Sequence, residues 1–133
     1  MYTKKVLQHF LHPRNMGKIK NPDGIGRAGN PVCGDTMELY IKIMMDKKKK
    51  KEVIKDLKFQ TIGCAAAISV SDIACDMLKG KTIEEALKLK NQDIIKKLGG
   101  LPENKIHCSL LAIEALKSAI NNYYNKNKGK AKI

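Results

Sequence analysis

The sequence predicts an α+β domain in which a small antiparallel β-sheet is covered by helices. Two observations predict it. Hydrophobic and polar residues alternate between residues 36 and 62, and hydrophobic residues recur at helical spacing from residue 65 onward. With 133 residues and 43% hydrophobic content, the chain suits a single domain with one core, spanning 1–133.

The N-terminal part is predicted to contain one helix and a long loop. Hydrophobic residues lie at helical spacing over residues 3–11, with Thr3 as the candidate N-cap, and Pro13 ends the helix. Residues 12–32 are rich in glycine and proline, which predicts a loop. We expect this N-terminal segment to be flexible, and we interpret His9 as a surface or capping residue.

Two strands are predicted to form a hairpin. Residues 36–45 and 53–62 each alternate, so that one face of each strand is hydrophobic. The run Lys47–Lys51 between them is interpreted as a solvated hairpin tip.

The remaining residues are predicted to be helical. One helix ends at Gly80, and Thr82 with Glu85 forms a capping box for the next. The predicted helices cover 65–79, 82–89, 91–98 and 105–123, followed by a lysine-rich tail over about 125–133.

The net charge of +13 raises the question of nucleic-acid binding. Only Arg14 and Arg27 carry the guanidinium that base and phosphate recognition favours, and aromatic residues make up just 5% of the chain. We therefore expect no nucleic-acid partner, although the charge can steer acidic proteins toward the chain.

Targeting signals are not apparent. No hydrophobic run approaches the roughly 20 residues that span a bilayer, and the first residues lack the hydrophobic stretch of a secretory signal. We therefore expect a cytoplasmic protein without membrane association, whose cysteines bind metal or react rather than form disulfides.

Three of the four cysteines lie at the ends of predicted elements. Cys33 precedes the first strand, whereas Cys64 and Cys108 lie where helices begin. A helix N-terminus favours an anion, and thiolate is the form that binds soft metals and attacks sulfur. Asp35 and His107 lie beside two of these cysteines. Spacing alone leaves two interpretations open, namely a metal or reactive-thiol site, or free cysteines that are simply buried.

Cys75 is set apart by geometry. It lies eleven residues beyond Cys64 in the same predicted helix, which corresponds to about 16 Å along the axis. A metal–sulfur bond is only about 2.3 Å long, so one compact site cannot readily include both thiols. We therefore expect Cys75 to belong to the core.

At these residues the chain resembles the IscU/NifU N-terminal family of iron–sulfur cluster scaffolds. The resemblance runs from about Tyr2 to Tyr124 and rests on several segments that occur in the family's order. These are Val6–Phe10 with Pro13–Gly17, Cys33–Asp35, Gly63–Cys64, Gly80–Thr82 and Lys105–Ser109.

The resemblance implies the roles of the site residues. Cys33, Cys64 and Cys108 would be sulfur ligands and persulfide acceptors, while Asp35 and His107 would complete the coordination. The cargo would be a transient [2Fe–2S] cluster, and zinc would suit the same ligands in the apo form. A carboxylate is a poor match for cluster iron, so Asp35 would keep the cluster transferable.

The resemblance also implies partners and a subgroup. Family members accept sulfur from a cysteine desulfurase, deliver clusters to carriers or apo-proteins, and in this chain a dimer could form on cluster binding. Such a protein is a scaffold and not an enzyme. His107 is present and there is no insertion between Cys64 and Cys108, which favours the IscU-like over the SufU-like branch. The family's recognition segment for an Hsp70-type chaperone differs at Glu103 and Asn104, so that partner is not implied here.

Two other functions compete with the scaffold. One is a zinc-dependent sulfur-transfer protein that uses the same thiols without building a cluster. The other, which is weaker, is a basic nucleic-acid-binding domain.

Overall fold

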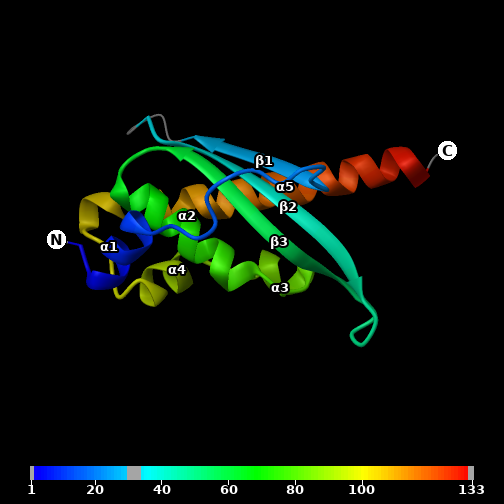
Figure 1. Ribbon diagram of the computed structural model, residues 1–133, viewed down its shortest axis with the longest axis horizontal. Helices are drawn as coiled ribbons and strands as arrows, with labels where there is room; N and C mark the ends of the chain where they lie inside the picture. The colour runs from blue at the N-terminus through cyan, green and yellow to red at the C-terminus, as the bar shows by residue number, and fades with distance from the viewer. Residues whose placement is uncertain (1, 30–33, 132–133) are drawn as a thin grey trace.

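A long β-hairpin is the central element of the fold (Figure 1). The computed structural model describes residues 2–29 and 34–131, with side chains through Lys126. Strand β2 (Thr36–Asp46) pairs antiparallel with β3 (Lys51–Ile62), and a register shift falls between Lys42 and Ile43. The predicted hairpin is confirmed, and its tip lies in the lysine run.

A third strand lies where the sequence predicted only loop. Strand β1 (Gly24–Gly29) pairs antiparallel with β2, giving the order β1-β2-β3. The loop prediction for 12–32 was wrong here because its glycines allow close packing and do not mark turns. A Cβ atom on Gly26 would lie 2.0 Å from the carbonyl oxygen of Ala115, so only glycine lets β1 approach the last helix.

Within residues 2–29 and 34–131, five α-helices and one short 3₁₀ helix complete the fold. They are α1 (Lys4–Leu11), α2 (Ala65–Leu78), α3 (Ile83–Leu87), α4 (Asn91–Lys97), the 3₁₀ helix η1 (Glu103–Lys105) and α5 (Cys108–Ala131). Helix α5 packs on β1 and β2, α2 packs on β3 and α5, and α1 packs on α2. The α+β class, with helices covering an antiparallel sheet, is therefore confirmed.

Local capping signals identified the starts of α1 and α3. The Thr3 hydroxyl accepts a hydrogen bond from the Val6 N–H, and Thr82 forms the predicted capping box with Glu85. The last helix differs from its prediction, because it begins at Cys108 and continues past Tyr123 to Ala131. Its C-terminal part carries few hydrophobic residues, so periodicity alone did not reveal that extension.

The hydrophobic core lies between the sheet and helices α2 and α5. Residues of alternate positions in the hairpin point into it, including Leu39, Ile41, Leu57 and Phe59, which are all essentially inaccessible to solvent. Cys75 belongs to this core, as predicted, with 1% of its surface exposed.

The N-terminal segment is attached to α2 by a buried polar cluster. His9 Nδ1 lies 2.6 Å from Asp72 Oδ2, and the other carboxylate oxygen accepts the backbone N–H groups of Arg14 and Asn15. His9 is therefore buried and paired, and its interpretation as a surface or capping residue was wrong. Buried polar groups need partners, and this cluster supplies them.

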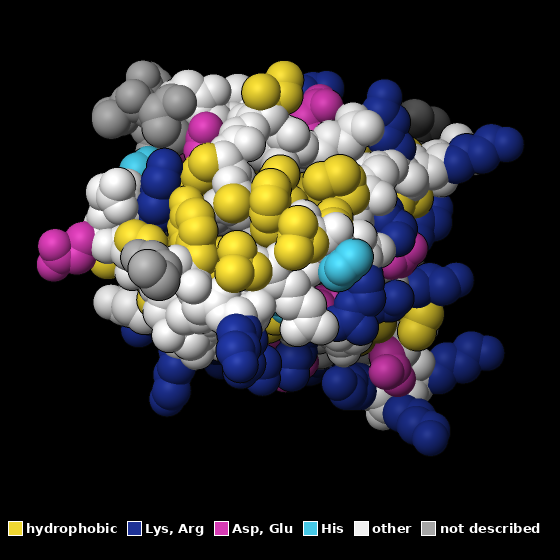
Figure 2. Space-filling view, turned by 60° about the vertical axis from the view of Figure 1, so that its left-hand side comes forward, with side chains coloured by type: hydrophobic (Ala, Val, Ile, Leu, Met, Phe, Trp, Pro, Cys, Tyr) yellow, Lys and Arg dark blue, Asp and Glu magenta, His cyan; other side chains and the backbone are white. Residues whose placement is uncertain are grey.

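The end of the molecule that carries α1 has a hydrophobic surface (Figure 2). Helix α1 contributes Leu7, Phe10 and Leu11 at helical spacing, and each has more than a third of its surface exposed. Within the described residues, no helix has the length and hydrophobicity needed to cross a membrane.

Candidate metal centre

Three elements converge on one end of the sheet. Asp35 immediately precedes β2, Cys64 is the N-cap residue of α2, and Cys108 is the first residue of α5. The backbone at Gly34 has a φ of +75°, a conformation that glycine adopts at no cost, and it leads directly into Asp35. Each of the three side chains is therefore positioned by the start of a strand or a helix.

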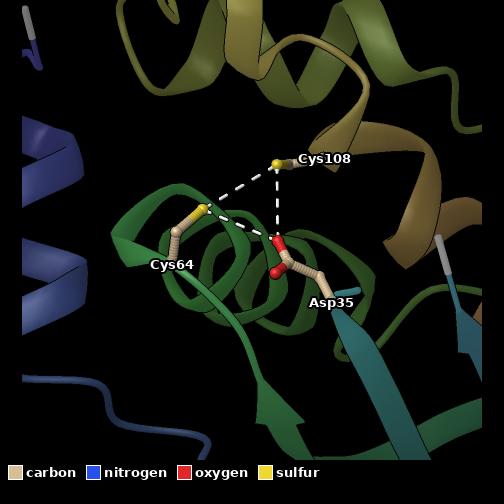
Figure 3. Close-up of side chains that lie close together, drawn as sticks. All are labelled: Asp35, Cys64 and Cys108. Atoms are coloured by element: carbon tan, nitrogen blue, oxygen red, sulfur yellow. Dashed lines mark hydrogen bonds between the residues drawn. The ribbon is translucent and has the colours of Figure 1, made fainter. Parts of the chain in front are cut away.

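The three side chains point toward one another (Figure 3). Asp35 Oδ2 lies 3.6 Å from Cys64 Sγ and 3.8 Å from Cys108 Sγ, and the two sulfur atoms are 4.0 Å apart. A tetrahedral metal with bonds of about 2.3 Å to sulfur places two sulfurs about 3.8 Å apart. The donor set thus fits a thiophilic metal with little movement.

Partial positive charge from two helix N-termini lies beside the two sulfurs. Both cysteines begin helices, where the unpaired N–H groups carry partial positive charge. The Cys64 side chain caps no backbone N–H and is free to face the site. Asp35 and Cys108 are buried, whereas Cys64 is partly exposed, so the site is reached from the Cys64 side.

His107 lies at the edge of the same group. Its Nε2 atom is 3.7 Å from Cys108 Sγ, and its side chain is half-buried. Cys33, the remaining predicted ligand, lies outside the described residues.

Gly63 fits against the Asp35 carboxylate. A Cβ atom at position 63 would lie 2.9 Å from Asp35 Cγ and 2.9 Å from Ala67 Cβ. These separations are shorter than any real contact, so a side chain here would displace the carboxylate. Sequence reasoning noted Gly63 only as part of a motif, and its packing role became visible in three dimensions.

Tyr2 and Lys105 interact electrostatically with the residues of the site. Neither residue was assigned a role from the sequence. Burial raises the pKa of Tyr2, and the negative charge of Cys64 adds to that rise. The same negative charge is the main cause of the raised pKa of Lys105. Lys105 therefore places a stable cation beside a group of anionic donors.

Cys75 is chemically separate from this group. Burial raises the pKa of its thiol well above the ordinary value, with the charge of Asp72 adding to the effect. A neutral thiol in a hydrophobic core neither binds metal nor attacks sulfur readily.

A second group of potential ligands lies in the buried polar cluster. Ligand atoms of His9, Asp72 and Asp76 lie within 4.8 Å of one another. The Asp72 carboxylate is already occupied, because it receives hydrogen bonds from His9, from the Asn15 side chain and from two backbone N–H groups. These hydrogen bonds show that the cluster anchors the N-terminal segment to α2.

Comparison with known proteins agrees with this geometry. The profile of the NifU-like N-terminal domain family matches residues 1–130. The iron–sulfur cluster assembly scaffold protein IscU 1 of Archaeoglobus fulgidus is 55% identical over 127 residues, covering 96% of this chain and 79% of that protein. The IscU protein of Aquifex aeolicus is 47% identical, and the match covers 94% of this chain and 77% of that protein. The IscU protein of Buchnera aphidicola is 45% identical, and the match covers 96% of this chain and 98% of that protein.

Solved structures share the fold. The N-terminal part of a NifU-like protein from Brucella abortus superposes with a TM-score of 0.69 at 21% identity, covering 93% of this chain and 94% of that chain. A structure from Fervidobacterium islandicum, assigned to a cluster assembly scaffold of the SUF system, gives 0.66 at 26% identity and covers 90% and 96%.

Proposed function

The chain belongs to the NifU-like N-terminal domain family, and from this premise we propose that it is a scaffold on which an iron–sulfur cluster is assembled before transfer to another protein. The observation that carries the proposal is the convergence of Asp35, Cys64 and Cys108 from three separate elements. Two thiols and a carboxylate at these distances suit a metal–sulfur cargo. A scaffold binds and passes on this cargo and is not itself an enzyme.

The proposed ligands are the thiolates of Cys33, Cys64 and Cys108, with Asp35 and His107 at the remaining position. Cluster iron prefers thiolate, so the cysteines would hold the cluster and the carboxylate would be the weakest ligand. A cluster held by one weak ligand can leave through that side. Burial of Asp35 beside two sulfurs supports this assignment.

Sulfur would arrive as a persulfide on a cysteine desulfurase. A thiolate of this chain attacks the terminal sulfur, the S–S bond to the desulfurase breaks, and the desulfurase thiolate leaves with the electron pair. Cleavage of the new persulfide to sulfide then takes two electrons, which an external thiol or an electron-transfer protein supplies. The partly exposed Cys64 gives such a partner access.

The hydrophobic surface of α1 is where we place the desulfurase. Leu7, Phe10 and Leu11 form an exposed face on the end of the molecule where α1 and the start of α2 lie together. Exposed hydrophobic patches on small proteins mark sites of protein contact. A partner seated there would reach the Cys64 end of α2.

The remaining proposals concern the cargo and its destination. We propose a [2Fe–2S] cluster, delivered to carrier or apo-proteins, with cluster binding able to bring two chains together. Zinc would fit the same two thiols and carboxylate in the apo form. The cytoplasmic location stays a prediction, because relatives of this chain include proteins named as mitochondrial.

Anaerobic reconstitution tests the proposed function. Ferrous iron, cysteine and a cysteine desulfurase should give the visible charge-transfer absorbance of a cluster, together with acid-labile sulfide in the protein fraction. Cys64→Ser should prevent both. Tight zinc binding with no absorbance under these conditions would instead assign the chain to zinc-dependent sulfur transfer.

A further inference from the structure

A groove lies beside the tip of the β2–β3 hairpin, far from the cysteine site. Its volume is about 310 Å³, and its lining includes Met45, Lys50, Lys51 and Tyr124. We call it the hairpin groove. Nothing in the scaffold function described above uses it.

The hairpin groove presents hydrophobic side chains to solvent. Met45 is 58% exposed and Tyr124 is 43% exposed, and the buried Ile83 lies beneath them in the lining. Methionine adapts its flexible side chain to different partners, and tyrosine combines a hydrophobic ring with a polar group. These residue types are typical of protein contact surfaces.

The hairpin tip beside the groove is cationic. Five consecutive lysines, Lys47–Lys51, occupy the hairpin tip and its first paired position. The two acidic residues of the lining are already engaged, because Glu84 pairs with Lys51 at 3.4 Å and Glu52 accepts a hydrogen bond from the Tyr123 hydroxyl. Among described residues, Lys47–Lys50 form no ion pair.

The hairpin tip is an ordered turn. Asp46 Oδ1 accepts the backbone N–H groups of Lys48 and Lys49, and Lys50 adopts the left-handed conformation with a φ of +54°. Glycine or asparagine adopts that conformation at lower cost than lysine. Turn geometry alone therefore does not favour lysine at position 50.

We propose that the hairpin groove docks an acidic segment of a partner protein that also inserts a hydrophobic side chain between Met45 and Tyr124. Complementary charge identifies this occupant. At this groove, neither a second copy of this chain, with its net charge of +13, nor the chain's own lysine-rich end supplies complementary charge. The exposed Met45 and Tyr124 give a hydrophobic centre that a nucleic-acid backbone would not use.

The position of the groove has a functional consequence. Strand β2 begins beside Asp35 and ends at Asp46, and its 11 residues span about 35 Å. Figure 1 shows the hairpin tip at the opposite end of the molecule from the start of α2, where Cys64 lies. A partner docked on the hairpin groove would hold the chain while leaving the cysteine site accessible.

Fluorescence anisotropy with a defined probe tests the proposal. The probe is a labelled peptide of alternating glutamate and leucine, and the matched probe replaces each leucine with serine. We expect saturable binding of the first that weakens steeply with salt, and clearly weaker binding of the second. The assay needs neither metal nor cluster, so its outcome is independent of the scaffold function.

Matched variants locate the binding site. Replacing Lys48, Lys49 and Lys50 by glutamine should weaken binding about tenfold, since each of these charges contributes modestly. The control replaces Lys18, Lys20 and Lys96, which are exposed elsewhere, and should change binding less than about twofold. Met45→Gln should weaken binding several-fold at unchanged charge.

One variant separates binding from folding. Asparagine adopts the left-handed conformation of residue 50 at lower cost than lysine does. In Lys50→Asn the melting temperature should therefore stay equal or rise, while peptide affinity falls. Equal loss of affinity in the control triple variant would overturn the proposal, because net charge alone would then explain binding. So would the absence of saturable binding, or tighter binding of a labelled DNA duplex than of the peptide.

Discussion

The sulfur atoms of Cys64 and Cys108 lie 4.0 Å apart, although 44 positions separate the two residues in the chain. The pairing depends on the start of α2 and the start of α5 meeting beside Asp35. Each helix directs its positive end toward the same point. The fold therefore concentrates partial positive charge where anionic sulfur is needed.

The first prediction contrasts Cys108 with Cys75. Cys108→Ser should abolish stable cluster assembly because it removes one of two converging sulfurs, whereas Cys75→Ala should leave assembly intact. Visible absorbance after anaerobic reconstitution measures both. Cys75 should also resist iodoacetamide at neutral pH in the folded protein, because its raised pKa keeps the thiol neutral. Equal loss of the cluster in both variants would contradict the separation of Cys75 from the site.

The second prediction concerns release of the cluster. Asp35→Ala removes the hardest ligand, so the cluster should form but transfer to an apo-acceptor about tenfold more slowly. Transfer is followed by the acceptor's own absorbance or activity. Glu103→Ala is the matched control, because Glu103 is an exposed carboxylate in η1, just before His107. Unchanged transfer in Asp35→Ala would count against a labile carboxylate ligand.

Local signals made much of this fold predictable. The hairpin follows from alternation over adjacent segments, and α1 and α3 follow from Thr3 and Thr82 as caps. Strand β1 was not predictable in the same way, because its glycines resemble those of a loop. They are needed because β1 packs closely against α5, about 90 residues later in the chain. A local pattern cannot report a contact of that separation.

The site was predictable to a similar extent. The sequence singled out residues at the ends of elements, and the structure brings three of them, Asp35, Cys64 and Cys108, together. The contribution of Gly63 was hidden, because it consists of making room for the Asp35 carboxylate. The pairing of His9 with Asp72 was hidden as well, because a buried hydrogen bond across 63 positions leaves no periodic signal.

The third prediction tests the close packing of β1 on α5. Gly26→Ala should lower the free energy of unfolding by about 3 kcal/mol, because the new Cβ atom would overlap backbone atoms of Ala115 and Ala119. Urea denaturation measures the change. Gly29→Ala in the same strand is the control, since its Cβ atom would come no closer than 3.9 Å to the described residues that surround it. Its stability should stay within about 0.5 kcal/mol of the parent, and equal losses in the two variants would contradict the packing argument.

The fourth prediction tests Gly63 as a residue that positions Asp35. The Cβ atom of Gly63→Ala would overlap the Asp35 carboxylate, so the carboxylate should turn away from the two thiols. Cobalt(II) affinity, followed by visible absorbance, should fall about tenfold because one donor of the set is displaced. The free energy of unfolding should fall by about 1–3 kcal/mol.

A double-mutant cycle distinguishes positioning from a general loss of stability. In the Asp35→Ala background, Gly63→Ala no longer meets a carboxylate, and only the contact with Ala67 remains. The two substitutions should therefore be non-additive in cobalt affinity, with a coupling of about 1 kcal/mol. Additive effects would show that Gly63 acts on the site by another route, since a residue that works only through Asp35 has no effect once that side chain is removed.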